Sequence, residues 1–131
     1  QSELAAIPGV GSTLLGGMVT YAVDAKVNQL GVSSEIIEQY GVVSAECATA
    51  MATQVKKMFK SDIGVALTGV AGPLELENKP AGTVWIAIIL PNDEVVTHEL
   101  HLSDMRNTNR LRAVKRTLHY LIQLLTRNKS L

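Results

Sequence analysis

The sequence of 131 residues has little of what secreted and membrane proteins depend on. It contains one cysteine, Cys47, and aromatic residues make up 4% of the chain. A single cysteine cannot form an internal disulfide, so we expect a reducing compartment and a cytoplasmic protein. No apolar run approaches the roughly 20 residues that cross a bilayer, and no basic start followed by an apolar stretch indicates a signal peptide. The sequence therefore predicts no membrane contact.

An excess of charge of one sign is also lacking. Twelve Lys and Arg balance twelve Asp and Glu, so nothing indicates a general nucleic-acid-binding surface. The histidines, His98, His101 and His119, do not have the spacing of metal ligands, and the sequence predicts no metal site. Cys47 lies one turn into a predicted helix among small residues, which favours a buried apolar role over that of a nucleophile.

The sequence does contain the apolar content and periodicity of one α/β domain, residues 1–131. Hydrophobic residues make up 47% of it. Helical spacing of apolar residues predicts long helices at Ser44–Lys60 and Asn107–Arg127. Shorter helices are expected at Val23–Leu30 and Glu35–Tyr40. Apolar or alternating runs predict strands at Gly16–Tyr21, Ile63–Thr68, Thr83–Leu90 and Glu94–Leu102. This alternation predicts a three-layer α/β/α domain with a mixed sheet.

A glycine-rich loop follows the predicted strand Ile63–Thr68. It reads Thr68-Gly69-Val70-Ala71-Gly72-Pro73 and lies at the carboxyl end of the strand, where open α/β sheets bind their ligands. Glycines at such a place let backbone N–H groups approach an anionic or carbonyl oxygen. The alternative is an ordinary connection between strands, and the residues alone leave both interpretations open.

Two basic residues stand where they could act on a ligand. Arg106 precedes the last predicted helix, and an arginine at such a junction can bind a phosphate or a carboxylate through its forked guanidinium. Lys26 follows Tyr21, which ends a predicted strand. A buried lysine beside a hydroxyl nucleophile can act as a general base. The alternative is a solvated helix lysine.

Six segments, taken in order, resemble one family. They are Y-x-x-x-x-K (Tyr21 and Lys26), L-G-V (30–32), Y-G-V-V-S (40–44), T-G-V-A-G-P (68–73), K-P-x-G-T-V-W-I-A (79–87) and the arginine of L-S-x-x-R (Arg106). On the basis of these segments, the chain resembles the CinA C-terminal domain family over its whole length. These are the competence/damage-inducible proteins whose active members are nicotinamide mononucleotide deamidases.

The resemblance implies a metal-independent amidohydrolase without a cofactor. Such an enzyme converts nicotinamide mononucleotide into nicotinic acid mononucleotide and ammonia, in pyridine-nucleotide recycling. The resemblance also implies that a serine in an E-S-x-T-G-G turn attacks the carboxamide, that Lys26 activates this serine, and that Tyr21 positions the reacting groups. The substrate-binding residues that it implies are Thr68, Gly69, Ala71, Gly72 and Arg106. We expect Tyr21, Lys26, Thr68, Gly69, Gly72 and Arg106 to converge in one cleft.

The serine turn of the family does not occur in this sequence. In the family it precedes the helix whose tail corresponds to Gln1–Ile7. We therefore expect an N-terminally incomplete domain that lacks about 20–30 residues, equivalent to a strand, a turn and most of a helix, and that is inactive alone. An incomplete sheet exposes an apolar face or an unpaired edge, which favours a homo-oligomer. Residues 74–78 (LELEN) also replace a glycine-rich stretch of the family.

Two other functions remain open at this point. The chain could be a degenerate, non-catalytic CinA-like domain that binds a nucleotide or a protein in competence or the DNA damage response. It could also be an unrelated α/β domain that binds a nucleotide. An E-S-x-T-G-G segment upstream of Gln1 would favour the enzyme over the degenerate domain.

Overall fold

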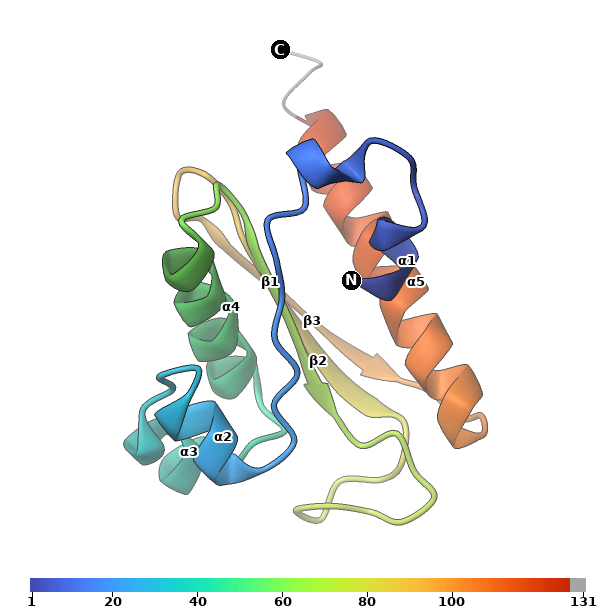
Figure 1. Cartoon of the computed structure of the whole chain (residues 1–131). Coiled ribbons are helices and arrows are strands. Elements are labelled where there is room, and N and C mark those ends of the chain that lie inside the picture. Colours follow the sequence, from blue (N-terminus) through green and yellow to red (C-terminus); the bar gives the residue numbers. More distant parts are fainter. Residues whose placement is uncertain (128–131) are drawn as a thin grey trace.

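Three strands lie between two long helices in the computed structural model, which describes residues 1–127 (Figure 1). Residues 128–131, the end of the predicted domain, lie outside the described residues. In chain order the elements are α1 (Ser2–Ala5), the 3-10 turn η1 (Val10–Ser12), α2 (Val23–Asn28), α3 (Ser34–Tyr40), α4 (Ala45–Phe59), β1 (Gly64–Gly69), β2 (Thr83–Ile89), β3 (Val95–His101) and α5 (Arg106–Arg127). Most of these bounds agree with the predicted ones within one or two residues.

The strand β2 is the centre of the sheet and is covered on both faces. It pairs antiparallel with β1 on one side and with β3 on the other. Because successive residues of a strand point to opposite faces, Ala87 and Ile89 pack in the core beneath α4. Ile86 and Ile88 pack in the second core, which α5 covers. Two helices on opposite faces of one sheet confirm the predicted three-layer α/β/α architecture.

The helix α4 begins where the sequence predicts it. Ser44 is its N-cap, and the Ser44 hydroxyl accepts a hydrogen bond of 3.1 Å from the backbone N–H of Cys47, which satisfies one of the unpaired donors of the first turn. Small and flexible apolar residues form its buried face: Cys47, Ala48, Met51 and Ala52. The helix ends at Phe59, and the C-cap residue Lys60 has a left-handed backbone conformation, as is common at helix ends.

The helix α5 packs on the other face through an aromatic contact with β3. The rings of His98 and Tyr120 stack, with their centroids 3.6 Å apart and their planes 5° from parallel. Burial lowers the pKa of His98 below 6.5, the usual histidine value, because an apolar environment disfavours the imidazolium. Burial therefore favours the neutral imidazole of His98.

We expect the free energy of unfolding to fall as the pH drops below 6.5. The unfolded chain then binds a proton at His98 more readily than the folded chain, because the folded-state pKa is the lower one. The stabilisation is present above the unfolded-state pKa and is lost as the pH falls through the folded-state pKa. Urea denaturation at about pH 7.5 and about pH 5.5 measures this change. His98→Phe, which keeps an aromatic ring against Tyr120, is expected to reduce it, and an unchanged pH dependence in this variant would contradict the assignment.

The predicted strand Gly16–Tyr21 is wrong, and so is the mixed sheet predicted from the alternation of helices and strands. Residues 14–21 form no strand, and the sheet in the described residues is antiparallel throughout. Figure 1 shows this stretch passing as an open chain between α4 and α5. A strand needs a hydrogen-bonded neighbour. Within residues 1–127 the one hydrogen bond that holds residues 15–21 is donated by the Lys26 side chain to the carbonyl of Thr20. Val19 and Tyr21 are consequently 70% and 76% exposed.

None of the helices within residues 1–127 has both the length and the apolar character needed to span a membrane.

Candidate functional site

The residues that the sequence predicts as functional lie at one end of the sheet. Figure 1 shows α2, the loop between β1 and β2, and the first turn of α5 at the same end, where β1 finishes. The antiparallel order explains this arrangement, because β1 ends, β2 begins and β3 ends at the same end of the sheet. The topology therefore brings Lys26, the loop 68–73 and Arg106 to one side of the molecule.

Lys26 is a buried lysine with one hydrogen bond to the described part of the chain. Its side chain lies in α2, the residue is 7% exposed, and Nζ donates to the carbonyl oxygen of Thr20 at 2.6 Å. In the part of the chain that the structure describes, no carboxylate oxygen lies within 4.0 Å of Nζ. Burying an amine with so few partners is costly. The solvated helix lysine that the sequence left open is therefore wrong, and Nζ keeps donors for a further group.

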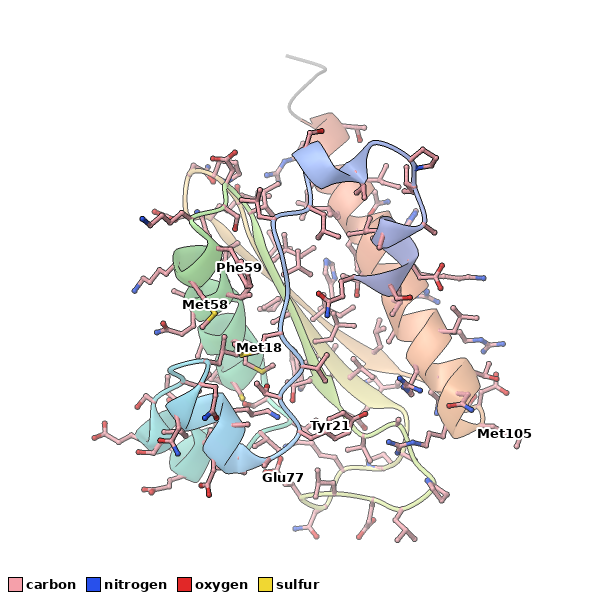
Figure 2. All side chains as sticks on the ribbon, in the orientation of Figure 1. Met18, Tyr21, Met58, Phe59, Glu77 and Met105 are labelled. Atoms are coloured by element: carbon pink, nitrogen blue, oxygen red, sulfur yellow. The ribbon has the colours of Figure 1, made fainter. Side chains whose placement is uncertain are left out.

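The two residues Thr20 and Tyr21, which precede α2, differ in the surroundings of their hydroxyl groups. The Thr20 hydroxyl is buried and has no hydrogen-bond partner among the described residues. The Tyr21 side chain is 76% exposed, and its hydroxyl makes no hydrogen bond within residues 1–127. Figure 2 shows Tyr21 at the same end of the molecule as Glu77. The role of Tyr21 in positioning the reacting groups stays a prediction.

Thr68 and Glu77 hold the turn that precedes α4 from two sides. The Thr68 hydroxyl donates to the carbonyl oxygen of Val42 at 2.7 Å. The Glu77 carboxylate accepts hydrogen bonds from the backbone N–H groups of Val42 and Val43, each at 2.9 Å. Gly41 permits this approach, since a Cβ there would lie 2.8 Å from the carboxylate, and its φ is +81°. The loop between β1 and β2 is thus tied to α4.

We expect Glu77→Ala to lower the free energy of unfolding by about 1–2 kcal/mol, since it leaves two backbone N–H groups without their charged acceptor. Glu75→Ala is the matched control, because Glu75 is an exposed glutamate of the same loop. Its effect is expected to stay within about 0.5 kcal/mol. Urea denaturation of both variants measures the difference, and equal effects would show that the Glu77 contact does not stabilise the fold.

Two residues of α5 hold successive carbonyl groups of the glycine-rich loop. Arg106 Nη1 donates to the carbonyl oxygen of Gly72 at 2.7 Å, and Asn109 Nδ2 donates to that of Ala71 at 3.1 Å. Asn109 is 1% exposed and also exchanges hydrogen bonds with the backbone of Asp104 at 2.8 and 3.0 Å. Arg106 is among the residues predicted from the sequence, and Asn109 is not. The spacing of three residues puts both side chains on one helix face, but this spacing alone does not indicate that Asn109 reaches the loop.

Cys47 is a buried thiol near Lys26 and Glu77. It is free and fully buried. Burial raises the pKa of the Cys47 thiol, while the nearby charge of Lys26 lowers it to a smaller extent. The neutral thiol is a poor nucleophile, which confirms the predicted apolar role. Within residues 1–127 no group of three or more His, Cys, Asp or Glu could hold a metal ion.

Two open grooves in the described surface lie away from these residues. One is formed by α3, α4 and β3, and includes Ile36, Ala50 and Val95. The other lies beside the end of α4, between Lys56 and Asp93. Neither groove contains a predicted site residue. The convergence of Tyr21, Lys26, Thr68, Gly69, Gly72 and Arg106 in one cleft therefore stays a prediction.

Comparison of the sequence with known proteins gives consistent matches. The profile of the CinA C-terminal domain matches residues 1–125. A relative from Lysinibacillus sphaericus (strain C3-41), named as a competence-damage inducible protein, is 62% identical over 125 residues, 95% of this chain and 30% of the relative. A relative of the same name from Listeria welshimeri is 44% identical over 129 residues, 98% of this chain and 31% of the relative. The chain thus spans less than a third of these relatives.

Comparison of the structure gives matches of the same kind. A competence or damage-inducible protein from Enterobacter asburiae has a TM-score of 0.92 at 29% identity, with 95% of this chain and 78% of that chain covered. The competence/damage inducible protein CihA from Agrobacterium tumefaciens has a TM-score of 0.88 at 36% identity, with 94% of this chain and 76% of that chain covered. Both solved chains therefore contain residues that have no counterpart in this one.

Proposed function

Because this chain belongs to the CinA C-terminal domain family, we propose that it forms the substrate-binding part of a metal-independent amidohydrolase. Its substrate is nicotinamide mononucleotide, and its products are nicotinic acid mononucleotide and ammonia. The family predicted from six sequence segments is confirmed by the profile match over residues 1–125. The substrate and the reaction are the proposal.

The observation that carries this proposal is the environment of Lys26. Lys26 is 7% exposed, its amine has one hydrogen-bond acceptor within residues 1–127, and α2, which contains it, lies at the end of the sheet where the glycine-rich loop and the first turn of α5 also lie. A lysine amine in such a place can take a proton from a hydroxyl nucleophile, as a general base does. Arg106 keeps further guanidinium donors besides the one bound to Gly72, and these suit a phosphate group.

The nucleophile of this proposal is a serine on a segment that precedes Gln1 in a longer protein. Two features of the fold support such a segment. Residues 15–21 have backbone groups without partners in the described chain, and the edge of β1 that does not face β2 is unpaired there. Unpaired edges accept a further strand. The solved structures that match this fold contain additional residues, since the match covers 78% and 76% of those chains.

The proposed reaction proceeds in two steps. The serine oxygen attacks the carboxamide carbon while Lys26 takes the hydroxyl proton, and the proton then passes to the leaving nitrogen as ammonia departs. Water next attacks the carbonyl carbon of the resulting ester while Lys26 takes a proton from the water, and this proton returns to the serine oxygen as the ester C–O bond breaks and nicotinic acid mononucleotide leaves. Tyr21 helps to position the reacting groups, while Thr68, Gly69, Ala71, Gly72 and Arg106 hold the nucleotide. The proposal includes a cytoplasmic location and a homo-oligomer, and it requires no cofactor.

An ammonia-release assay with purified nicotinamide mononucleotide tests this proposal. The 131-residue chain alone is expected to show no meaningful turnover, because groups that act as a unit lose most of their effect when one is removed. A longer form with the upstream serine segment is expected to release ammonia. Robust turnover by the 131-residue chain would make one of its own hydroxyls the nucleophile. No turnover by the longer form would favour a non-catalytic nucleotide- or protein-binding domain.

A further inference from the structure

We propose that Asn109 is a positioning residue, which aims the backbone N–H of Gly72 at the bound ligand. This inference rests on the proposed function, because it takes the loop 68–73 as the part that holds the nucleotide. Its basis is the hydrogen bond of 3.1 Å from Asn109 Nδ2 to the carbonyl oxygen of Ala71. No sequence pattern pointed to this residue.

The planarity of the peptide unit links the two groups. The carbonyl of Ala71 and the N–H of Gly72 belong to one peptide unit, in which they point in opposite directions when the bond is trans. The carbonyl of Ala71 points to Asn109 in α5. The N–H of Gly72 must then point away from α5. Asn109 thus fixes the direction of a donor that it does not itself touch.

The preceding peptide unit follows the same rule. The carbonyl of Val70 accepts a hydrogen bond from the N–H of Gly82 at the start of β2, so the N–H of Ala71 points away from Gly82. The N–H groups of Ala71 and Gly72 make no hydrogen bond within residues 1–127. A backbone donor without a partner in the described chain can bind an anionic or carbonyl oxygen. The next residue, Pro73, has no N–H, so Gly72 is the last donor of the loop.

Burial and hydrogen bonding fix the orientation of the Asn109 side-chain amide. The side chain is 1% exposed, and its amide makes three hydrogen bonds, one to Ala71 and two to the backbone of Asp104. A buried polar side chain with this many partners has one orientation, because rotating it would leave buried groups unpaired. Arg106, one turn earlier, holds the carbonyl of Gly72. Together the two side chains fix both carbonyl groups on the α5 side of the loop.

Asn109→Asp is the sharpest variant for a test. Aspartate has the shape of asparagine and keeps an acceptor for the N–H of Asp104, but it has no N–H to donate to the carbonyl groups of Ala71 and Asp104. The matched control is Thr117→Val. Thr117 is also buried in α5, at 4% exposure, and its hydroxyl bonds only within the helix, to the carbonyl of Ala113. The control therefore removes a buried hydrogen bond without touching the loop.

The experiment is a titration of the ¹⁵N-labelled chain with nicotinamide mononucleotide, followed by the amide signal of Gly72. We expect this signal to shift in the wild-type chain and in Thr117→Val. We expect Asn109→Asp to bind nicotinamide mononucleotide about tenfold more weakly or worse. This is the loss predicted when the Gly72 N–H no longer donates to an anionic group of the nucleotide. Its Gly72 signal should also differ from wild type before ligand is added, since the peptide unit has turned.

Three results would overturn the inference. They are wild-type affinity in Asn109→Asp, an equal loss of affinity in Thr117→Val, and a Gly72 signal that does not respond to the nucleotide in the wild-type chain. The last result needs no variant, so it holds even if Asn109→Asp fails to fold. Ammonia release by the longer form together with any of these results would leave the proposed function intact. If the Gly72 signal responds to the nucleotide but the longer form releases no ammonia, the proposed reaction is refuted and the inference about Asn109 is not.

Discussion

Replacing Lys26 by methionine in the longer, serine-containing protein is expected to slow ammonia release by about 10³-fold or more. Methionine fills a similar space without an amine, so the packing of α2 is retained while the proton acceptor is lost. The buried position and single hydrogen bond of Lys26 make it the one candidate base that the proposal uses. Binding of the nucleotide should change much less, because the proposed contacts of the nucleotide come from the loop 68–73 and Arg106.

Lys56→Met is the control for the Lys26 variant. The Lys56 side chain is 16% exposed and its amine is bonded to the carbonyl of Leu90 and to Asp93, at 2.9 and 2.7 Å. It is therefore a second largely buried lysine, but it lies beside a groove without predicted site residues. Its replacement is expected to affect stability and to leave kcat near the wild-type value. Similar losses of kcat in both variants would contradict the role of Lys26 as base.

Replacing Arg106 by alanine is expected to raise KM for nicotinamide mononucleotide by about 10–100-fold, the range of a charge-assisted hydrogen bond. The same replacement also removes the bond to the carbonyl of Gly72, which disturbs the loop for every substrate. Nicotinamide riboside, which lacks the phosphate, separates these two effects. We expect its KM to change far less, because the guanidinium has no phosphate to bind.

Arg110→Ala is the control for the Arg106 variant. Arg110 lies one turn further along α5, is exposed, and bonds to Asn107 at 3.3 Å. Removing it changes the charge of the helix by the same amount without touching the loop. KM for both substrates should stay near the wild-type value. An Arg106→Ala variant in which KM rises equally for the mononucleotide and the riboside would contradict a phosphate contact.

The sequence predicted those parts of the fold that have a local pattern. The apolar spacing of α4 and α5 and the alternation in β2 and β3 arise within each element, so they can be read along the chain. The stretch 16–21 has the apolar residues of a strand, but a strand also requires a partner. No described residue pairs with it. Residues 16–21 thus have the local apolar pattern of a strand, but no neighbouring strand with which to form hydrogen bonds among the described residues.

The sequence predicted only those residues of the site that belong to recognisable motifs. Lys26 and Arg106 belong to segments that resemble the family, and the structure adds the burial of the first and the loop contact of the second. Glu77 and Asn109 were missed because their contacts join residues 34 to 38 positions apart. Such long-range hydrogen bonds leave no periodic trace in a sequence, so only a folded chain reveals them.

A crystal structure of the longer protein with nicotinamide mononucleotide bound tests the central claim most directly. The upstream serine should be replaced by alanine so that the substrate persists. The account predicts the carboxamide beside Nζ of Lys26, the phosphate beside the guanidinium of Arg106, and the N–H of Gly72 donating to the nucleotide. A nucleotide bound in the groove between α4 and β3, or at any place out of reach of Lys26, would contradict it.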